Sequence, residues 1–116
     1  TPNFSNQLLK RFLENKLLTK KSTKFLYKTM VSTSVGQNRI KAKLPTNTEV
    51  AHRTGSSFTN DAGLTGAIND IGIVKLPNGK YLIISIFVHN TTEKFKDGEE
   101  IIADITKATW DNYTTK

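Results

Sequence analysis

The chain has 116 residues, a hydrophobic share of 36%, no cysteine and a formal net charge of +7. This length suits one domain or part of a larger one, and the lack of cysteine excludes disulfides, thiol nucleophiles and thiolate metal sites. His52 and His89 lie far apart in the sequence without metal-ligand spacing. We therefore expect neither a metal ion nor any other cofactor.

The charge is unevenly distributed. Residues 1–60 contain eleven Lys or Arg and two Glu, whereas residues 61–116 contain six Lys and eight Asp or Glu. A basic half can indicate nucleic acid or a membrane as partner. Here the basic side chains are spread along helical patterns as solvated faces, and no nucleic-acid motif accompanies them. The longest apolar run, Tyr81–Val88, is too short to span a bilayer. We expect no nucleic-acid partner and no membrane insertion.

The first part of the chain predicts helices. Thr1-Pro2 is typical of a helix start, and apolar side chains then recur at helical spacing to about Lys16. Thr19 can cap a second helix that continues to about Thr33. Asn38–Leu44 is expected to form one short helical turn.

From Glu49 the pattern changes to that of strands. The expected strands are Glu49–Ser56, Ala67–Leu76 and Tyr81–Val88, and Asn78-Gly79 predicts a tight hairpin between the last two. Tyr81–Val88 is apolar on both faces, so we expect it between two layers.

A last helix is expected over roughly Lys96–Tyr113. Its predicted inner stripe, with Trp110 at one margin, consists of Ile101, Ile102, Ile105, Thr109 and Tyr113. The order of elements is typical of an α+β fold, with helices packed on an antiparallel sheet. We interpret residues 1–116 as a single unit, with a helical part (1–45) followed by three strands and the C-terminal helix (46–116).

One short motif, Arg53-Thr54-Gly55-Ser56, combines a cation, two hydroxyls and a glycine at the end of the first strand. Out of context, such a run is usually a strand entering a loop. Strand alternation places Arg53 and Gly55 on one face and Thr54 and Ser56 on the other. They can therefore bind one ligand only if the strand lies at a sheet edge that the ligand approaches side-on.

The motif and its flanks resemble the C-terminal portion of class A serine β-lactamases, which belong to the penicillin-recognising enzyme family. Within that family the likeness is to the cephalosporinase-like branch of gut anaerobes, of the Bacteroides type. Arg53-Thr54-Gly55 matches the Lys-Thr-Gly box of the family, with arginine in the first place. The resemblance covers essentially the whole chain and also rests on Gly36–Lys41, Leu44-Pro45, Val50–His52, Asn69–Val74, Leu76–Lys80 and Ile101–Ile105.

The resemblance implies a substrate-binding role for the four residues of the motif. Arg53 would attract the β-lactam carboxylate, and Thr54 would donate its hydroxyl to the same group. Gly55 would let the backbone lie close to the substrate, and Ser56 would supply its backbone N–H to the oxyanion hole and its hydroxyl to the carboxylate. Because arginine keeps its proton near neutrality, a proton-carrying role at position 53 is disfavoured. Some family members carry a further carboxylate-binding arginine on the neighbouring strand, but Ala67–Leu76 has none.

The family reaction requires elements that this sequence lacks. Acyl transfer uses a Ser-x-x-Lys nucleophile motif, a Ser-Asp-Asn motif and, in class A, a glutamate that activates the deacylating water. Neither motif occurs here, and in the family all three elements precede the matching region. The resemblance therefore implies a part of a periplasmic or secreted β-lactamase that does not hydrolyse β-lactams by itself.

Two other interpretations stay open. The chain could belong to a penicillin-binding transpeptidase or an inactive family member, or it could act as an interaction module. In the family, the strand that matches Tyr81–Val88 pairs on its far side with N-terminal strands. Unpaired edges invite pairing with another chain, so we expect dimerisation, strand exchange or association with the N-terminal part.

Overall fold

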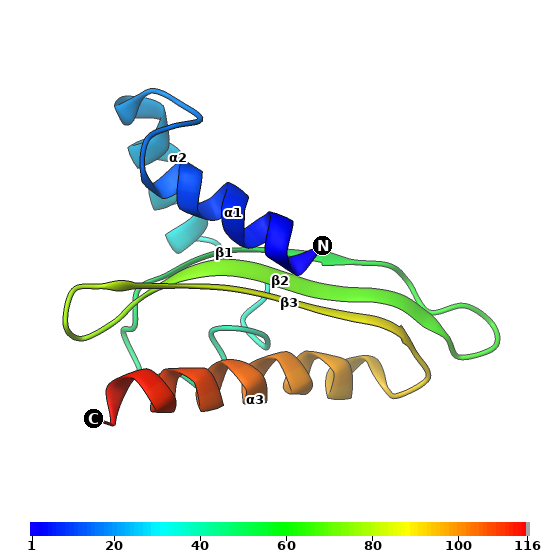
Figure 1. Ribbon diagram of the computed structural model, residues 1–116. Coiled ribbons are helices and arrows are strands. Elements are labelled where there is room, and N and C mark those ends of the chain that lie inside the picture. The colour runs from blue at the N-terminus through cyan, green and yellow to red at the C-terminus, as the bar shows by residue number, and fades with distance from the viewer. Residues whose placement is uncertain (116) are drawn as a thin grey trace.

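The computed structural model describes residues 1–115 as three helices and one sheet. The elements are α1 (Pro2–Leu13), α2 (Lys20–Val31), β1 (Val50–Ser56), β2 (Thr65–Lys75), β3 (Tyr81–Thr91) and α3 (Phe95–Thr114). The strands are antiparallel in the order β1-β2-β3. The two N-terminal helices lie on one face of the sheet and α3 lies along the other (Figure 1). This arrangement confirms the α+β fold expected from the sequence.

Both predicted N-terminal caps are confirmed. The Oγ1 of Thr1 accepts a hydrogen bond from the Phe4 N–H at 3.2 Å, and the Oγ1 of Thr19 accepts one from the Ser22 N–H at 3.1 Å. These bonds satisfy backbone donors that have no partner inside the helix. The first helix ends before the expected Lys16 because Asn15 adopts a left-handed φ of 61°.

The segment between α2 and β1 contains separate turns, in place of the helical turn expected over Asn38–Leu44. The N–H groups of Arg39 and Ala42 each donate to the carbonyl three residues earlier, at 3.3 and 3.0 Å. The Ile40 N–H donates instead to a carboxylate oxygen of Asp70 at 3.2 Å. Because this amide is bound to the sheet, it is not available to a continuous helical ladder.

The hairpin between β2 and β3 forms where the sequence predicts it. Gly79 has a φ of 83°, which glycine adopts without steric strain, and the Leu76 N–H donates to the Lys80 carbonyl at 2.8 Å. Pairing at the other end extends past the apolar residues, with Thr65 opposite Thr91. The two strands are therefore longer than their hydrophobic patterns indicate.

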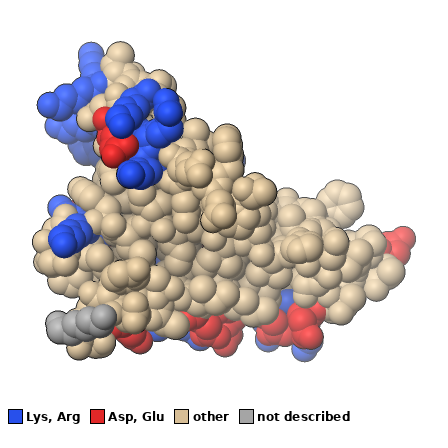
Figure 2. Space-filling model, in the orientation of Figure 1, with Lys and Arg blue, Asp and Glu red and all other residues tan. Residues whose placement is uncertain are grey.

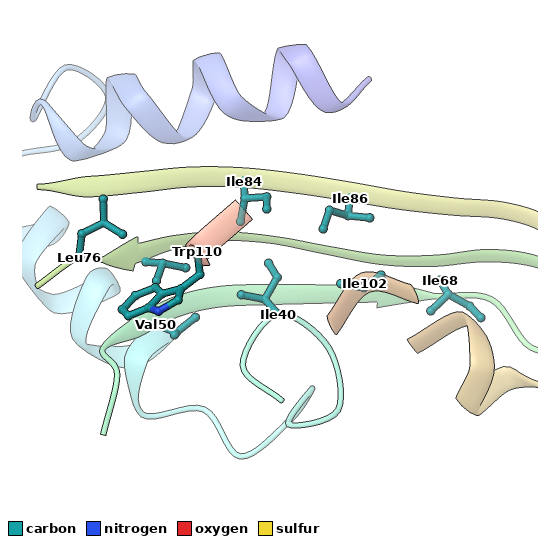
Figure 3. Packing of buried hydrophobic residues seen from close by; sticks show 9 residues of the cluster. Ile40, Val50, Ile68, Leu76, Ile84, Ile86, Ile102 and Trp110 are labelled. Atoms are coloured by element: carbon teal, nitrogen blue, oxygen red, sulfur yellow. The ribbon is translucent and has the colours of Figure 1, made fainter. Parts of the chain in front are cut away.

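Apolar side chains fill both sides of the sheet. On one side, Leu9 and Phe12 of α1 pack against Ala51 and Ile73. The larger cluster lies between the sheet and α3 (Figure 3) and consists of Ile40, Val50, Ile68, Val74, Leu76, Ile84, Ile86, Ile102 and Trp110. Ile84 and Ile86 bring β3 into this cluster, while Ile83 faces the other. The expectation that this strand lies between two layers is confirmed.

The predicted inner stripe of the last helix is wrong in most of its members. Of the predicted residues only Ile102 is buried, whereas Ile101 and Ile105 are 42% and 45% exposed and Tyr113 is 58% exposed. The buried face consists of Gly98, Ile102, Ala103, Thr106 and Trp110. A Cβ on Gly98 would lie 2.5 Å from Ile68 Cδ1, so small residues let α3 approach the sheet closely. The helix has two apolar stripes, and the stripe with small side chains packs against the sheet.

Charge is separated across the sheet. The helices α1 and α2 carry six Lys or Arg and no acidic residue, whereas α3 carries five Asp or Glu and two Lys. Figure 2 shows the basic side chains over the α1–α2 end and the acidic ones along α3. Over residues 1–115, the structure has no helix with the length and apolar character needed to cross a membrane.

Candidate functional site

The Arg53–Ser56 motif lies on an edge strand. Among residues 1–115, β1 pairs with β2 alone, and this pairing places Arg53 opposite Ile71 and Thr54 opposite Asp70. Arg53, Gly55 and Ser56 are exposed and Thr54 is half-buried. The motif can bind one ligand only if its strand lies at a sheet edge, and β1 does. A ligand that approaches the free margin of β1 can reach side chains on both faces of the strand.

The backbone of Ser56 is directed away from the sheet. The Ser57 N–H donates to the Ala67 carbonyl at 2.9 Å, toward β2. Successive residues of an antiparallel strand alternate between facing the partner strand and facing away. The N–H of Ser56 therefore points to the open side of β1, where it is available to an acceptor that lies along the margin.

A second arginine, Arg39, lies against the same end of β1. Its Nη1 donates to the carbonyls of Gly55 and Asn69 at 3.2 and 2.7 Å, and its Nη2 donates to the Ser56 Oγ at 2.6 Å. Its Nε pairs with Glu99 of α3 at 3.0 Å, and the side chain is only 5% exposed. The neighbouring strand β2 carries no arginine, but a turn after α2 supplies one. In the sequence this arginine belongs to the run Gly36–Lys41, which resembles the family only as a flank of the motif.

A buried, hydrogen-bonded pair of side chains lies under the motif. His52 and Asp70 are 2% and 0% exposed, and the Nδ1 of His52 lies 2.9 and 3.1 Å from the two carboxylate oxygens of Asp70. The Nε2 of His52 is buried without a hydrogen-bond partner among the described residues. His52 is thus a packed and hydrogen-bonded strand residue.

Tyr27 of α2 fixes the chain where it enters β1. Its hydroxyl donates to Glu49 Oε2 at 2.7 Å. Burial raises the pKa of the Tyr27 phenol well above its ordinary value, and the hydrogen bond to the Glu49 carboxylate raises this pKa further. Tyr27 is therefore a neutral hydrogen-bond donor over the physiological pH range.

The candidate site is an open margin rather than an enclosed cavity. A cavity of about 620 Å³ lies elsewhere and is lined mainly by residues 41–49 together with Val31 and Gln37. Within residues 1–115, no group of three His, Cys, Asp or Glu side chains has the geometry of a metal site. The groups that the margin offers to a ligand are a cation, hydroxyls and an outward N–H, which together suit an anion that carries a polarised carbonyl.

Comparisons with known proteins show which family the chain resembles. The model of the beta-lactamase enzyme family matches residues 1–113. The chain is 47% identical to Beta-lactamase VEB-1 of Pseudomonas aeruginosa, with 100% of this chain and 39% of that protein covered. It is 40% identical to a beta-lactamase of Bacteroides uniformis, with 96% of this chain and 38% of that protein covered.

Solved structures give the same result. The TLA-3 extended-spectrum beta-lactamase superposes with a TM-score of 0.96 at 50% identity, over 97% of this chain and 41% of that one. A representative class A beta-lactamase from Bacteroides cellulosilyticus superposes with a TM-score of 0.96 at 35% identity, over 100% of this chain and 42% of that one. The chain belongs to the beta-lactamase enzyme family. It spans less than half the length of the relatives that it matches.

Proposed function

We propose that this chain is the C-terminal, carboxylate-binding portion of a class A serine β-lactamase that hydrolyses β-lactam antibiotics through an acyl-serine intermediate. The observation that carries the proposal is the exposed Arg53–Ser56 margin of an edge strand, in a chain whose relatives are beta-lactamases. The relatives' names favour a lactamase over a transpeptidase. The chain has neither Ser-x-x-Lys nor Ser-Asp-Asn, so the nucleophile comes from outside these 116 residues.

Each residue of the margin has a role in the proposal. The guanidinium of Arg53 attracts the substrate carboxylate, and the hydroxyls of Thr54 and Ser56 donate hydrogen bonds to it. Gly55 has open space where a Cβ would stand, so substrate can lie against the backbone. The outward N–H of Ser56 donates to the oxyanion that forms when serine attacks the lactam carbonyl, a contribution of roughly 3 kcal/mol to transition-state stability.

The buried Arg39 adds a second cation behind this margin. Its hydrogen bond to the Ser56 Oγ leaves the hydroxyl hydrogen of Ser56 free to point outward. Arg39 thereby orients the donor that meets the carboxylate. In this proposal Arg39 takes the place of the arginine that some family members carry on the neighbouring strand.

The test uses a complete protein, made by joining this chain to the preceding portion of the Pseudomonas aeruginosa relative. Arg53→Ala is expected to lower kcat/KM for a chromogenic cephalosporin by about 10²-fold, because a charge-assisted hydrogen bond to the substrate is lost. Arg53→Lys keeps the charge and should retain more activity. Lys80→Ala removes an exposed cation at the distant hairpin and is the matched control. An unchanged kcat/KM in Arg53→Ala would remove the proposed role.

The proposal includes the location and the assembly of the protein. We place the complete enzyme in the periplasm or outside the cell, as cell fractionation with activity measurements would test. Among residues 1–115 the outer edge of β3 has no strand partner, and such an edge pairs readily with another strand. We propose that the isolated chain dimerises, exchanges strands or binds the N-terminal part through this edge. A stable monomer in size-exclusion chromatography at high concentration would contradict this.

A further inference from the structure

One buried carboxylate holds both the edge strand and the turn segment that supplies the second arginine. Asp70 lies on the central strand directly opposite Thr54, and both of its oxygens contact His52 Nδ1. One of these oxygens also accepts the Ile40 N–H at 3.2 Å. Ile40 follows Arg39 in the chain, so a fixed Ile40 backbone determines where the Arg39 side chain begins.

The packing of the turn segment that contains Arg39 shows how tightly the backbone position of this segment is constrained. Gly36 has a φ of 79°, and a Cβ there would lie 2.4 Å from the Thr54 methyl carbon and 3.1 Å from His52 Cε1. The backbone of the segment therefore rests directly on the side chains of His52 and Thr54. A shift of this backbone would move Arg39 relative to both the motif and α3.

The contacts of the His52–Asp70 pair determine which of the two side chains donates the hydrogen bond. One Asp70 oxygen already accepts the Ile40 N–H and both oxygens lie within hydrogen-bond distance of Nδ1, so the Asp70 side chain is the acceptor and Nδ1 of His52 carries the hydrogen. With Nδ1 bound to Asp70, the imidazole ring is fixed against Gly36. An aliphatic side chain of similar size could fill this space but could not hold the carboxylate in place.

We propose that Asp70 and His52 are positioning residues, which place Arg39 and through it the Ser56 hydroxyl for the substrate carboxylate. The predicted effect on substrate binding rests on the proposed function. The placement of Arg39 by Asp70 and His52 can be tested without any activity measurement. Neither side chain reaches the exposed margin, since both are buried. Their effect on a substrate therefore passes through Arg39.

The first experiment measures hydrogen exchange by NMR in the ¹⁵N-labelled complete protein described above. In Asp70→Asn, the Ile40 amide and the Arg39 Nε–H should exchange at least about tenfold faster than in the unsubstituted chain, because the Ile40 amide loses a charged acceptor. Amides of the β2–β3 ladder, such as Ile73, should keep their protection. Unchanged exchange at Arg39 would overturn the proposal.

Two substitutions at His52 separate positioning from packing. In His52→Asn the side-chain amide can stand near the place of Nδ1 and donate to Asp70, whereas His52→Leu fills the space without a donor. We expect exchange at Arg39 to stay close to that of the unsubstituted chain in His52→Asn and to rise in His52→Leu. Equal exchange in the two variants would show that the ring acts by packing alone, and would overturn the role of His52. If Asp70→Asn does not fold, these two variants still test whether the His52–Asp70 pair positions Arg39.

The second experiment measures kinetics in the complete protein described above. Asp70→Asn should raise KM for a carboxylate-bearing β-lactam by about tenfold with a smaller change in kcat, since it weakens binding through Arg39. In a protein that already carries Arg39→Lys, the same substitution should change KM by less than about twofold, because coupled residues are not additive. Asp111→Asn, at the far end of α3, is the matched control and should change neither constant.

The outcomes are distinguishable. Full additivity of Asp70→Asn and Arg39→Lys would overturn the positioning role even in an active enzyme. A complete protein with no β-lactam hydrolysis would refute the proposed function, and the exchange measurements would still decide whether Asp70 and His52 position Arg39.

Discussion

The contacts of Arg39 lead to a sharp prediction about stability. Its nearly buried guanidinium joins three parts of the molecule: Glu99 of α3, the carbonyls of Gly55 and Asn69 in the sheet, and the Ser56 hydroxyl. Arg39→Ala removes all of these bonds at once. It also leaves the Glu99 carboxylate, whose side chain is 14% exposed, without its cation.

The size of the effect follows from this burial. Removal of one partner from a buried ion pair costs about 3–5 kcal/mol, because the other charge stays buried and uncompensated. For a domain of this size, 1 kcal/mol corresponds to about 4–8 °C in Tm, so Arg39→Ala should lower Tm by at least about 12 °C. Arg53→Ala, at an exposed position, should change the free energy of unfolding by less than about 0.5 kcal/mol.

Urea and thermal unfolding followed by circular dichroism measure both variants. The double variant Arg39→Leu/Glu99→Leu supplies a further check, since it removes both charges and should be more stable than Arg39→Ala. The reasoning is refuted if Arg39→Ala costs less than about 1 kcal/mol, a value typical of an exposed pair. It is also refuted if Arg53→Ala destabilises the chain equally.

Three further predictions concern the scaffold. Gly98→Ala should lower the free energy of unfolding by about 1–3 kcal/mol through its clash with Ile68, and the loss should shrink in a chain that also carries Ile68→Val. Thr19→Ala should cost about 1 kcal/mol in urea unfolding, as expected for a lost N-terminal cap. Because the folded state raises the pKa of Tyr27, one tyrosine should ionise late in an alkaline titration followed by ultraviolet absorbance. Stability from its bond to Glu49 is fully present below the ordinary tyrosine pKa of about 10 and is lost as pH rises beyond it. Tyr27→Phe should abolish the late step, and its persistence would assign it to another tyrosine.

Local signals in the sequence predicted the scaffold well. The caps at Thr1 and Thr19 and the turn at Asn78-Gly79 depend on residues within a few positions of each other, so the sequence alone determines them. The hydrophobic pattern placed all three strands and their antiparallel order. It missed the polar strand ends around Thr91, since backbone pairing continues where apolar side chains stop.

The face of α3 and the role of Arg39 could not be predicted in the same way. Two apolar stripes on one helix have similar periodicity, and only the fit of Gly98 against Ile68 selects between them. Arg39 is separated by 60 positions from Glu99 and by 17 from Ser56, so no local pattern joins them. The Arg53–Ser56 motif can be recognised in the sequence because its four residues are contiguous. The parts that hold it in place come from distant segments.

The separation of basic and acidic side chains across the sheet has a kinetic consequence. The cationic α1–α2 face and the acidic α3 face together act as a molecular dipole, and the sheet that contains β1 lies between them (Figure 1). An anion that diffuses toward the molecule would be drawn to its cationic side, and hence toward the side chain of Arg53, before any contact forms. Capture of such a ligand should therefore slow as ionic strength rises, since mobile ions screen charges that are more than about 10 Å apart at 0.1 M salt.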